Sequence, residues 1–308
     1  MAHQPVICTE GEWVELTALD ASAISFQNHG PSGIMINVTT GPAPTSFDGA
    51  VRVLPGEKHY SLPLIDLAPG VAGGESVWAY ATEGGAVVTS FTGLYPDVAL
   101  DFVNGVYELN QVQVGFDDAL AYTGPGKVFN GGLAIDSDTE TLKIPAAVIQ
   151  AAILAATGSS AMPAAISIAI AGYMTYADEG TFGTNRAVEW AVDGSNRIRQ
   201  SLSTSGADVG KMFFAQSSGG VQDTVNTVAA AYTPGVNVPF SIASYHTATA
   251  INGAHEGTLL TANVTPTALA DLVAADFEIA QLGNFIIEGV RIWFTDIGDA
   301  GIQEAAQL

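Results

Sequence analysis

Short hydrophobic segments, each ended within a few residues by glycine, proline, asparagine or aspartate, make up most of the chain. Runs of this length that are rich in Val, Ile, Phe and Tyr are typical of strands, because amphipathic helices need a longer, 3.6-residue pattern. The pattern therefore predicts an all-β fold. Between residues 24 and 91 it predicts these strands: ISFQN, IMINVT, AVRVL, SVWAYA and AVVTSF.

The segment SVWAYA is apolar on both faces. Trp78 and Tyr80 alternate with smaller apolar residues, and successive side chains of a strand point to opposite faces. Two partly apolar faces are what a small sandwich or an interface requires. Three aromatic residues of this block are candidates for either the core or an interface: Trp13, Trp78 and Tyr95.

The strand pattern stops near residue 95 and restarts with LDFVNGVYELN, which predicts a linker over residues 93–100 between domains 1–95 and 100–308. In the second block, RAVEWAVDGSNRIRQSLST alternates on both sides of Asp193-Gly194 and predicts a hairpin. Helical patterns are short and few: Ala146 to Ala156, Ala268 to Ala275 and the tail after Asp299.

Composition narrows the class of protein. The 308 residues fit two domains, and 48% hydrophobic against 13% charged residues indicates a folded chain. A net charge of −22, from 9 basic and 31 acidic residues, argues against nucleic-acid binding, which needs clustered cations. The one cysteine, Cys8, excludes an intrachain disulfide and is predicted to be an incidental thiol.

The hydrophobic content does not predict a membrane helix. The most apolar stretch, Pro145 to Ala156, is interrupted by polar residues 157–160 and falls short of the roughly 20 residues a span needs. Residues 1–13 lack a basic region followed by an apolar run, so we expect synthesis in a cytoplasm without a secretory signal.

The order of segments in the second block resembles the concanavalin A-like lectin/glucanase jelly roll, in its laminin-G and pentraxin branch. The segments that carry the resemblance are LDFVNGVYEL, AISIAIAGYMTYAD, AVEWAVDGSNRIRQSL, FSIASYHTATAINGAHEG and IIEGVRIWFTDIGDAGIQEAAQ. The resemblance implies a hairpin over an Asn252-Gly253 turn and a closing strand followed by a short helix near Asp299. It also implies a C-terminal jelly-roll sandwich behind the small N-terminal β-sandwich.

The N-terminal segments ISFQNHGPSGIMINVT, VRVLPGEKHYSLPL and GGAVVTSF resemble small β-domains that attach phage proteins to a particle. Together the two resemblances imply a phage virion surface protein of the head decoration or head fibre type. Residues 1–95 would then anchor and oligomerise the protein. The expected partners are other copies in a homo-oligomer, with a trimer favoured, and the major capsid protein.

Sequence motifs for catalysis are missing. Retaining glycosidases need two carboxylates about 5 Å apart, and the E-x-D-x-x-E pattern that supplies them in the concanavalin-like family is absent. Glu189 comes nearest, with Ala191 two places later. Carboxylates meeting across strands remain an alternative. We therefore expect a domain that binds or scaffolds and is not an enzyme.

Two kinds of ligand site are possible in the second block. The alternate oxygens of Asp136, Asp138 and Glu140 would suit calcium, although a solvated turn has the same pattern, and no other cofactor is expected. Aromatic rings stack on sugars, whereas Trp190 and Trp293 alternate with apolar partners and are predicted to be core. The candidates for sugar contact lie beside turns: Tyr173, Tyr176, Tyr232 and Tyr245.

These predictions favour a non-enzymatic structural protein on the outer virion surface, a capsid decoration protein or head fibre, with host glycans as ligands of the jelly roll. The first alternative is a tail fibre or baseplate protein that recognises host polysaccharide. The second is a secreted glycan-active enzyme. No nucleic acid or membrane partner is expected.

Overall fold

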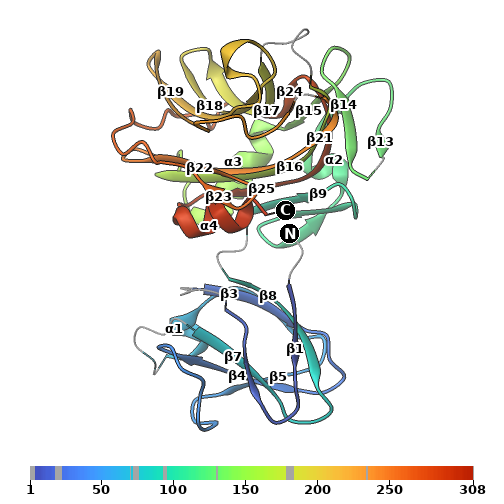
Figure 1. Ribbon diagram of the computed structural model, residues 1–308, viewed down its shortest axis with the longest axis vertical. Coiled ribbons are helices and arrows are strands. Elements are labelled where there is room, and N and C mark those ends of the chain that lie inside the picture. The colour runs from blue at the N-terminus through green and yellow to red at the C-terminus, as the bar shows by residue number, and fades with distance from the viewer. Residues whose placement is uncertain are drawn as a thin grey trace. The chain divides into compact units, whose positions relative to one another are not determined.

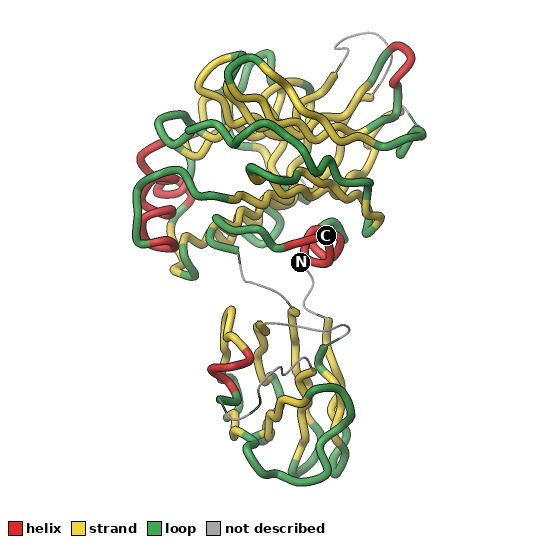
Figure 2. The backbone as a smooth tube through the Cα atoms, turned by 90° about the vertical axis from the view of Figure 1, so that its left-hand side faces the viewer, coloured by secondary structure: helices red, strands yellow, loops and turns green. Residues whose placement is uncertain are grey.

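The computed structural model describes residues 4–17, 23–69, 71, 76–92, 96–129, 131–177, 184–233 and 235–307. The chain divides into two compact units, residues 1–95 and 96–308 (Figure 1). Each unit has its own hydrophobic core. Strands make up most of both units and the helices are short (Figure 2). The predicted fold class is confirmed: a small N-terminal β-sandwich is followed by a jelly-roll sandwich.

The N-terminal unit consists of two antiparallel sheets around one core. Its elements are β1 (Gln4–Cys8), β2 (Trp13–Glu15), β3 (Ala23–Asn28), β4 (Ile34–Thr39), β5 (Val51–Val53), β6 (Lys58–Pro63), α1 (Leu64–Leu67), β7 (Ser76–Ala81) and β8 (Ala86–Thr92). The strand orders are β1-β8-β3-β6 and β2-β7-β4-β5. Ile24, Phe26, Ile36 and Val77 are among the side chains that fill the space between them.

The C-terminal unit also has two antiparallel sheets. The first, here the β16 sheet, has the order β11-β10-β9-β25-β16-β21-β22-β23, with β14 pairing β25 and β13 pairing β14. Its strands are β9 (Val98–Asp101), β10 (Val106–Leu109), β11 (Val112–Val114), β13 (Val128–Phe129), β14 (Leu133–Asp136), β16 (Ala165–Ala177), β21 (Gly235–Thr247), β22 (Ile251–His255), β23 (Thr258–Leu259) and β25 (Asn284–Trp293).

The second, here the β18 sheet, has the order β12-β15-β24-β17-β18-β19-β20. Its strands are β12 (Ala121–Thr123), β15 (Thr141–Ile144), β17 (Thr184–Asp193), β18 (Asn196–Ser203), β19 (Met212–Ser218), β20 (Val221–Asn226) and β24 (Phe277–Leu282). The helical elements of this unit are α2 (Phe116–Ala119), α3 (Ala146–Thr157), α4 (Gly298–Ala305) and the 3₁₀ turn η1 (Gly206–Asp208).

Several local predictions are confirmed. The Asp193-Gly194 hairpin joins β17 to β18, α3 covers the predicted Ala146–Ala156 helix, and α4 lies in the C-terminal tail. Trp190 and Trp293 are both buried.

Among the described residues, no helix combines the length and the hydrophobicity that a membrane span requires.

Two local predictions are wrong. Residues 268–275 form no helix, because carbonyl groups there bond side chains from elsewhere: Val273 accepts from Gln150, and Ala275 from the Trp190 indole. Asn252-Gly253 is not a turn but lies inside β22. A Cβ on Gly253 would fall 2.2 Å from the Phe214 ring, so glycine is needed there for close packing between the sheets.

Candidate ligand-binding face

The β17–β18 hairpin is held in register by its turn. Asp193 Oδ1 accepts hydrogen bonds from the backbone N–H of Ser195 at 2.7 Å and of Asn196 at 2.9 Å. These bonds hold the pKa of Asp193 below its usual range. The resulting register pairs Glu189 with Arg199. Because side chains alternate along a strand, Arg197 and Arg199 point to the outer face, whereas Ile198 between them is in the core.

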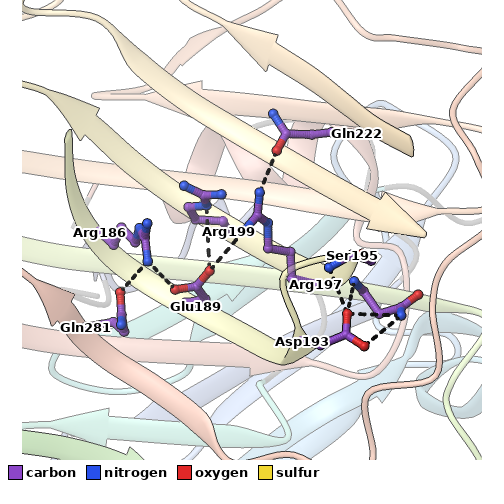
Figure 3. Close-up of polar contacts among 9 residues, drawn as sticks. Arg186, Glu189, Asp193, Ser195, Arg197, Arg199, Gln222 and Gln281 are labelled. Atoms are coloured by element: carbon purple, nitrogen blue, oxygen red, sulfur yellow. Dashed lines mark hydrogen bonds and ion pairs between the residues drawn. The ribbon is translucent and has the colours of Figure 1, made fainter. Parts of the chain in front are cut away.

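Three arginines surround Glu189 on the outer face of the β18 sheet (Figure 3). Glu189 Oε2 accepts a hydrogen bond from Arg186 Nη1 at 2.9 Å. Its Oε1 lies 3.9 Å from both Arg197 Nη1 and Arg199 Nε. The side chain of Glu189 is only 8% exposed, against 15–29% for the three arginines. The face therefore presents guanidinium groups over a largely covered carboxylate.

The cluster has more positive than negative charge. The pKa of Arg199 is lowered first by burial and then by repulsion from Arg197 and Arg186, which Glu189 counteracts. Beyond Glu189 the same row of the sheet continues with Glu278 and Lys143, and Lys143 is paired with Asp276 at 2.5 Å. The arginine cluster is therefore a local basic group in a chain whose net charge is −22.

Some N–H groups of the three arginines make no hydrogen bond within the described part of the protein. The Nε atoms of Arg186, Arg197 and Arg199 are buried and have no hydrogen-bond partner among the described residues. The remaining contacts are with neutral amides: Arg186 donates to Gln281 at 2.9 Å and Arg197 donates to Gln222 at 3.0 Å. The accessible nitrogens of such guanidinium groups can donate to carboxylate, sulfate or hydroxyl oxygens.

These arginines are not among the site residues predicted from the sequence. A usable signal was present, because three of the five arginines of the chain fall between residues 186 and 199. The alternation Arg197-Ile198-Arg199 also predicted a shared face. The alternation does not predict the face to which Arg186 points, because the strand register shifts between Arg186 and Val188.

Glu189 has an acidic neighbour on another strand, which is the alternative that the sequence left open. Glu278 on β24 is its register partner. The pKa of Glu278 is raised, first by burial and then by the charge of Glu189. Two carboxylates therefore meet across strands, without the one-strand motif.

Of the four tyrosines predicted to contact sugar, the three with described side chains are not gathered at this face. Tyr173 on β16 and Tyr245 on β21 belong to the other sheet. Tyr245 is 7% exposed, and its pKa is raised to about 12 by burial and by Asp299. The Tyr232 hydroxyl donates to the carbonyl of Ser203, and burial raises its pKa. The side chain of Tyr176 lies outside the described part of the structure.

In the predicted calcium turn, the carboxylates accept hydrogen bonds from the backbone of the turn itself. Asp136 Oδ1 accepts from the N–H of Asp138 at 3.1 Å, and Glu140 Oε2 accepts from the N–H of Asp136 at 2.7 Å. Glu140 Oε1 also accepts from the Tyr122 hydroxyl at 2.5 Å. Across the described residues, no group of three or more His, Cys, Asp or Glu side chains is arranged to hold a metal ion.

Of the interface candidates, Trp13 and Trp78 lie half-buried on strands β2 and β7 of the N-terminal unit. The structure places both on the outer face of the β2-β7-β4-β5 sheet. Tyr95 lies outside the described residues.

No family model matches the chain, and no curated protein does. Solved structures with similar folds include the binding domain of botulinum neurotoxin DC in complex with rat synaptotagmin II, at 10% identity and a TM-score of 0.48, over 68% of this chain and 50% of that one. Another is the botulinum neurotoxin serotype D binding domain, at 8% identity and a TM-score of 0.46, over 69% and 51%.

A third is the Ruminococcus gnavus IT-sialidase CBM40 bound to α2,6-sialyllactose, at 10% identity and a TM-score of 0.36, over 47% of this chain and 84% of that one. The chain spans about half the length of the neurotoxin chains it matches. Similarity at this level carries no inference about ligands.

Proposed function

We propose that the C-terminal sandwich is a non-enzymatic glycan-binding domain whose binding face is the arginine cluster of the β18 sheet. The observation that carries this proposal is the group of three partly exposed guanidinium groups, those of Arg186, Arg197 and Arg199, around one largely covered carboxylate. A hydrogen bond from a charged donor contributes about 1.5–3 kcal/mol. The accessible part of these side chains would supply such bonds to a ligand oxygen.

The charge of the face indicates the class of glycan. Three guanidinium groups face one carboxylate directly, so the ligand we propose carries a carboxylate or sulfate group, which a guanidinium binds in bidentate fashion. The net charge of −22 repels long polyanions such as nucleic acids. A sugar chain with single acidic groups avoids most of this repulsion.

The test is a binding screen of the full chain against acidic and neutral glycans, followed by calorimetry on the best ligand. Arg197→Gln removes a guanidinium that is not the main partner of Glu189, and we expect about tenfold to hundredfold weaker binding. Arg52→Gln, an exposed arginine of the N-terminal unit, is the charge-matched control. No glycan binding, or equal binding by Arg197→Gln and the wild type, would refute the proposal.

We further propose that the protein is displayed on the outer surface of a phage virion as a capsid decoration protein or head fibre. The support is the resemblance of the N-terminal segments to particle-anchoring β-domains, together with the separate core of residues 1–95. Immunogold labelling of purified particles tests it. Label over the heads supports the proposal, label at tail tips supports the tail fibre or baseplate alternative, and unlabelled particles refute both.

One observation favours an enzymatic alternative. Glu189 and Glu278 are register partners, and the raised pKa of Glu278 suits a general acid. Against this, the three arginines hold Glu189 in ion pairs that oppose its use as a nucleophile. Incubating the wild type and Glu278→Gln with glycans found in the screen separates the two functions, since hydrolysis by the wild type alone would establish the enzyme.

A further inference from the structure

The outer face of the β2-β7-β4-β5 sheet is rich in aromatic side chains. Strand register aligns Trp13 on β2, Tyr80 on β7, Met35 on β4 and Arg52 on β5 in one row. The next row contains Glu15, Trp78 and Asn37. The residues between them, including Ile34, Ile36, Val77 and Ala79, are fully buried in the core. Large apolar groups therefore occupy the side of the sheet where a one-sided sandwich would have polar ones.

Three aromatic rings form a cluster that reaches solvent: Trp13, Tyr80 and Phe47. Trp13 lies 5.2 Å from Tyr80 and 5.5 Å from Phe47, and Phe47 lies 4.8 Å from Tyr80, measured between ring centroids. Phe47 comes from the loop between β4 and β5 and is 49% exposed. Trp13, Tyr80 and Met35 are half-buried. An exposed aromatic cluster of this kind is typical of a protein interaction surface.

Polar groups next to these rings are already bonded. The Trp78 indole N–H donates to Thr39 Oγ1 at 2.9 Å, and the Asn37 amide donates to the Asp48 carbonyl at 3.3 Å. A sugar site needs free polar groups beside the ring to bind hydroxyls. The tilted and edge-on ring angles, between 42° and 90°, also give no flat platform. The face suits a protein surface better than a sugar.

The charges at its two edges complement each other. Glu15 lies on the edge strand β2, and Arg52 lies on the opposite edge strand β5. Arg52 is exposed and has no ion pair in the described part of the chain. Residues 1–95 contain only one other basic residue, Lys58.

We propose that this face binds the same face of a second copy of the chain, around a two-fold axis parallel to the strands. That axis places β5 of each copy over β2 of the other. Arg52 then lies over the Trp13 ring of the partner, a cation–π arrangement, with Glu15 of the partner in the next row. The aromatic residues of β7 and the loop meet in the centre of the interface, as in isologous dimers.

This contact pairs copies of the chain. The trimer expected from the sequence would need a different, head-to-tail interface, because a self-complementary face closes on itself with two subunits.

Sedimentation equilibrium of the full chain over a range of concentrations tests the proposal. We expect a species of twice the 31.7 kDa chain mass. Phe47→Ser should weaken the dimer by about tenfold or more, because aromatic anchors dominate interfaces and two are lost per dimer. Val228→Ser, at a 93% exposed position of the other unit, is the matched control and should leave the dimer unchanged.

A charge swap tests the orientation. Arg52→Glu should weaken the dimer by about tenfold, because it places two acidic groups together at each edge. The double variant Glu15→Arg with Arg52→Glu should restore most of the affinity, since the pair is re-formed with opposite sign. A monomer at all concentrations, or a dimer that neither Phe47→Ser nor Arg52→Glu affects, would overturn the proposal. Circular dichroism of each variant confirms that it is folded.

Discussion

Glu189 Oε1 lies 3.9 Å from Nε of Arg199, its register partner on the neighbouring strand. Arg199 is one of three arginines around a carboxylate that is only 8% exposed. The carboxylate therefore stabilises a group of cations that would otherwise repel one another.

Replacing Glu189 with glutamine keeps its shape and removes its charge. We expect the C-terminal unit to lose about 2 kcal/mol of unfolding free energy, less than for a fully buried pair because the arginines are partly exposed. Chemical denaturation measures the loss. Asp138→Asn removes one charge from an exposed turn of the same unit and should change stability by less than about 0.5 kcal/mol. Equal effects of the two substitutions would contradict the role of Glu189.

Gly253 is required by packing between the sheets. A Cβ at this position would lie 2.2 Å from one carbon of the Phe214 ring and 2.4 Å from another. Gly253→Ala should therefore destabilise the C-terminal unit by about 1–3 kcal/mol, through displacement of the ring. A Cβ on Gly194 in the β17–β18 turn meets nothing within 4 Å, so Gly194→Ala is the control. Thermal unfolding of both variants compares them, and a neutral Gly253→Ala would disprove the close approach.

His246 should make the stability of the C-terminal unit depend on pH. The side chain is fully buried, and burial lowers its pKa to about 3. Its Nε2 lies 2.9 Å from Ser244 Oγ. In the unfolded chain a histidine titrates near pH 6.5, so between these two values the unfolded state binds the extra proton. The contribution of neutral His246 is thus complete above about pH 6.5 and is lost as the pH falls towards 3.

The change is at most about 1.4 kcal/mol per pH unit. It is measured as the difference in unfolding free energy between pH 7 and pH 4.5, for the wild type and for His246→Gln. The variant lacks the titrating ring and should show a smaller loss in acid. Identical losses would mean that His246 does not contribute to the acid sensitivity.

Cys8 reports on the unfolding of the N-terminal unit. The thiol is fully buried in that core, and burial raises its pKa to about 11. Because the thiolate is the reactive form, the native protein should react with a thiol reagent at pH 8 at least about a hundredfold more slowly than the unfolded protein. Absorbance of the released chromophore measures the rate. Rapid labelling of the native chain would place Cys8 outside the core.

The sequence by itself determined the fold class, because its short alternating segments can bury one face only as strands. It also determined the β17–β18 hairpin, whose turn residues and alternation are local signals. The predictions made from the sequence are wrong where contacts between distant residues override the local pattern. Residues 268–275 bond to distant side chains instead of forming a helix, and Gly253 serves the packing against Phe214 rather than a turn.

Only the tertiary structure decided which side chains form a site. Arg186 reaches Glu189 through a register shift, and Glu278 arrives from a strand about 90 residues later in the chain. Phe47 joins Trp13 and Tyr80 from a loop. Strand pairing of this kind is set by long-range contacts that no local spacing records, because every strand presents the same backbone groups to any neighbour.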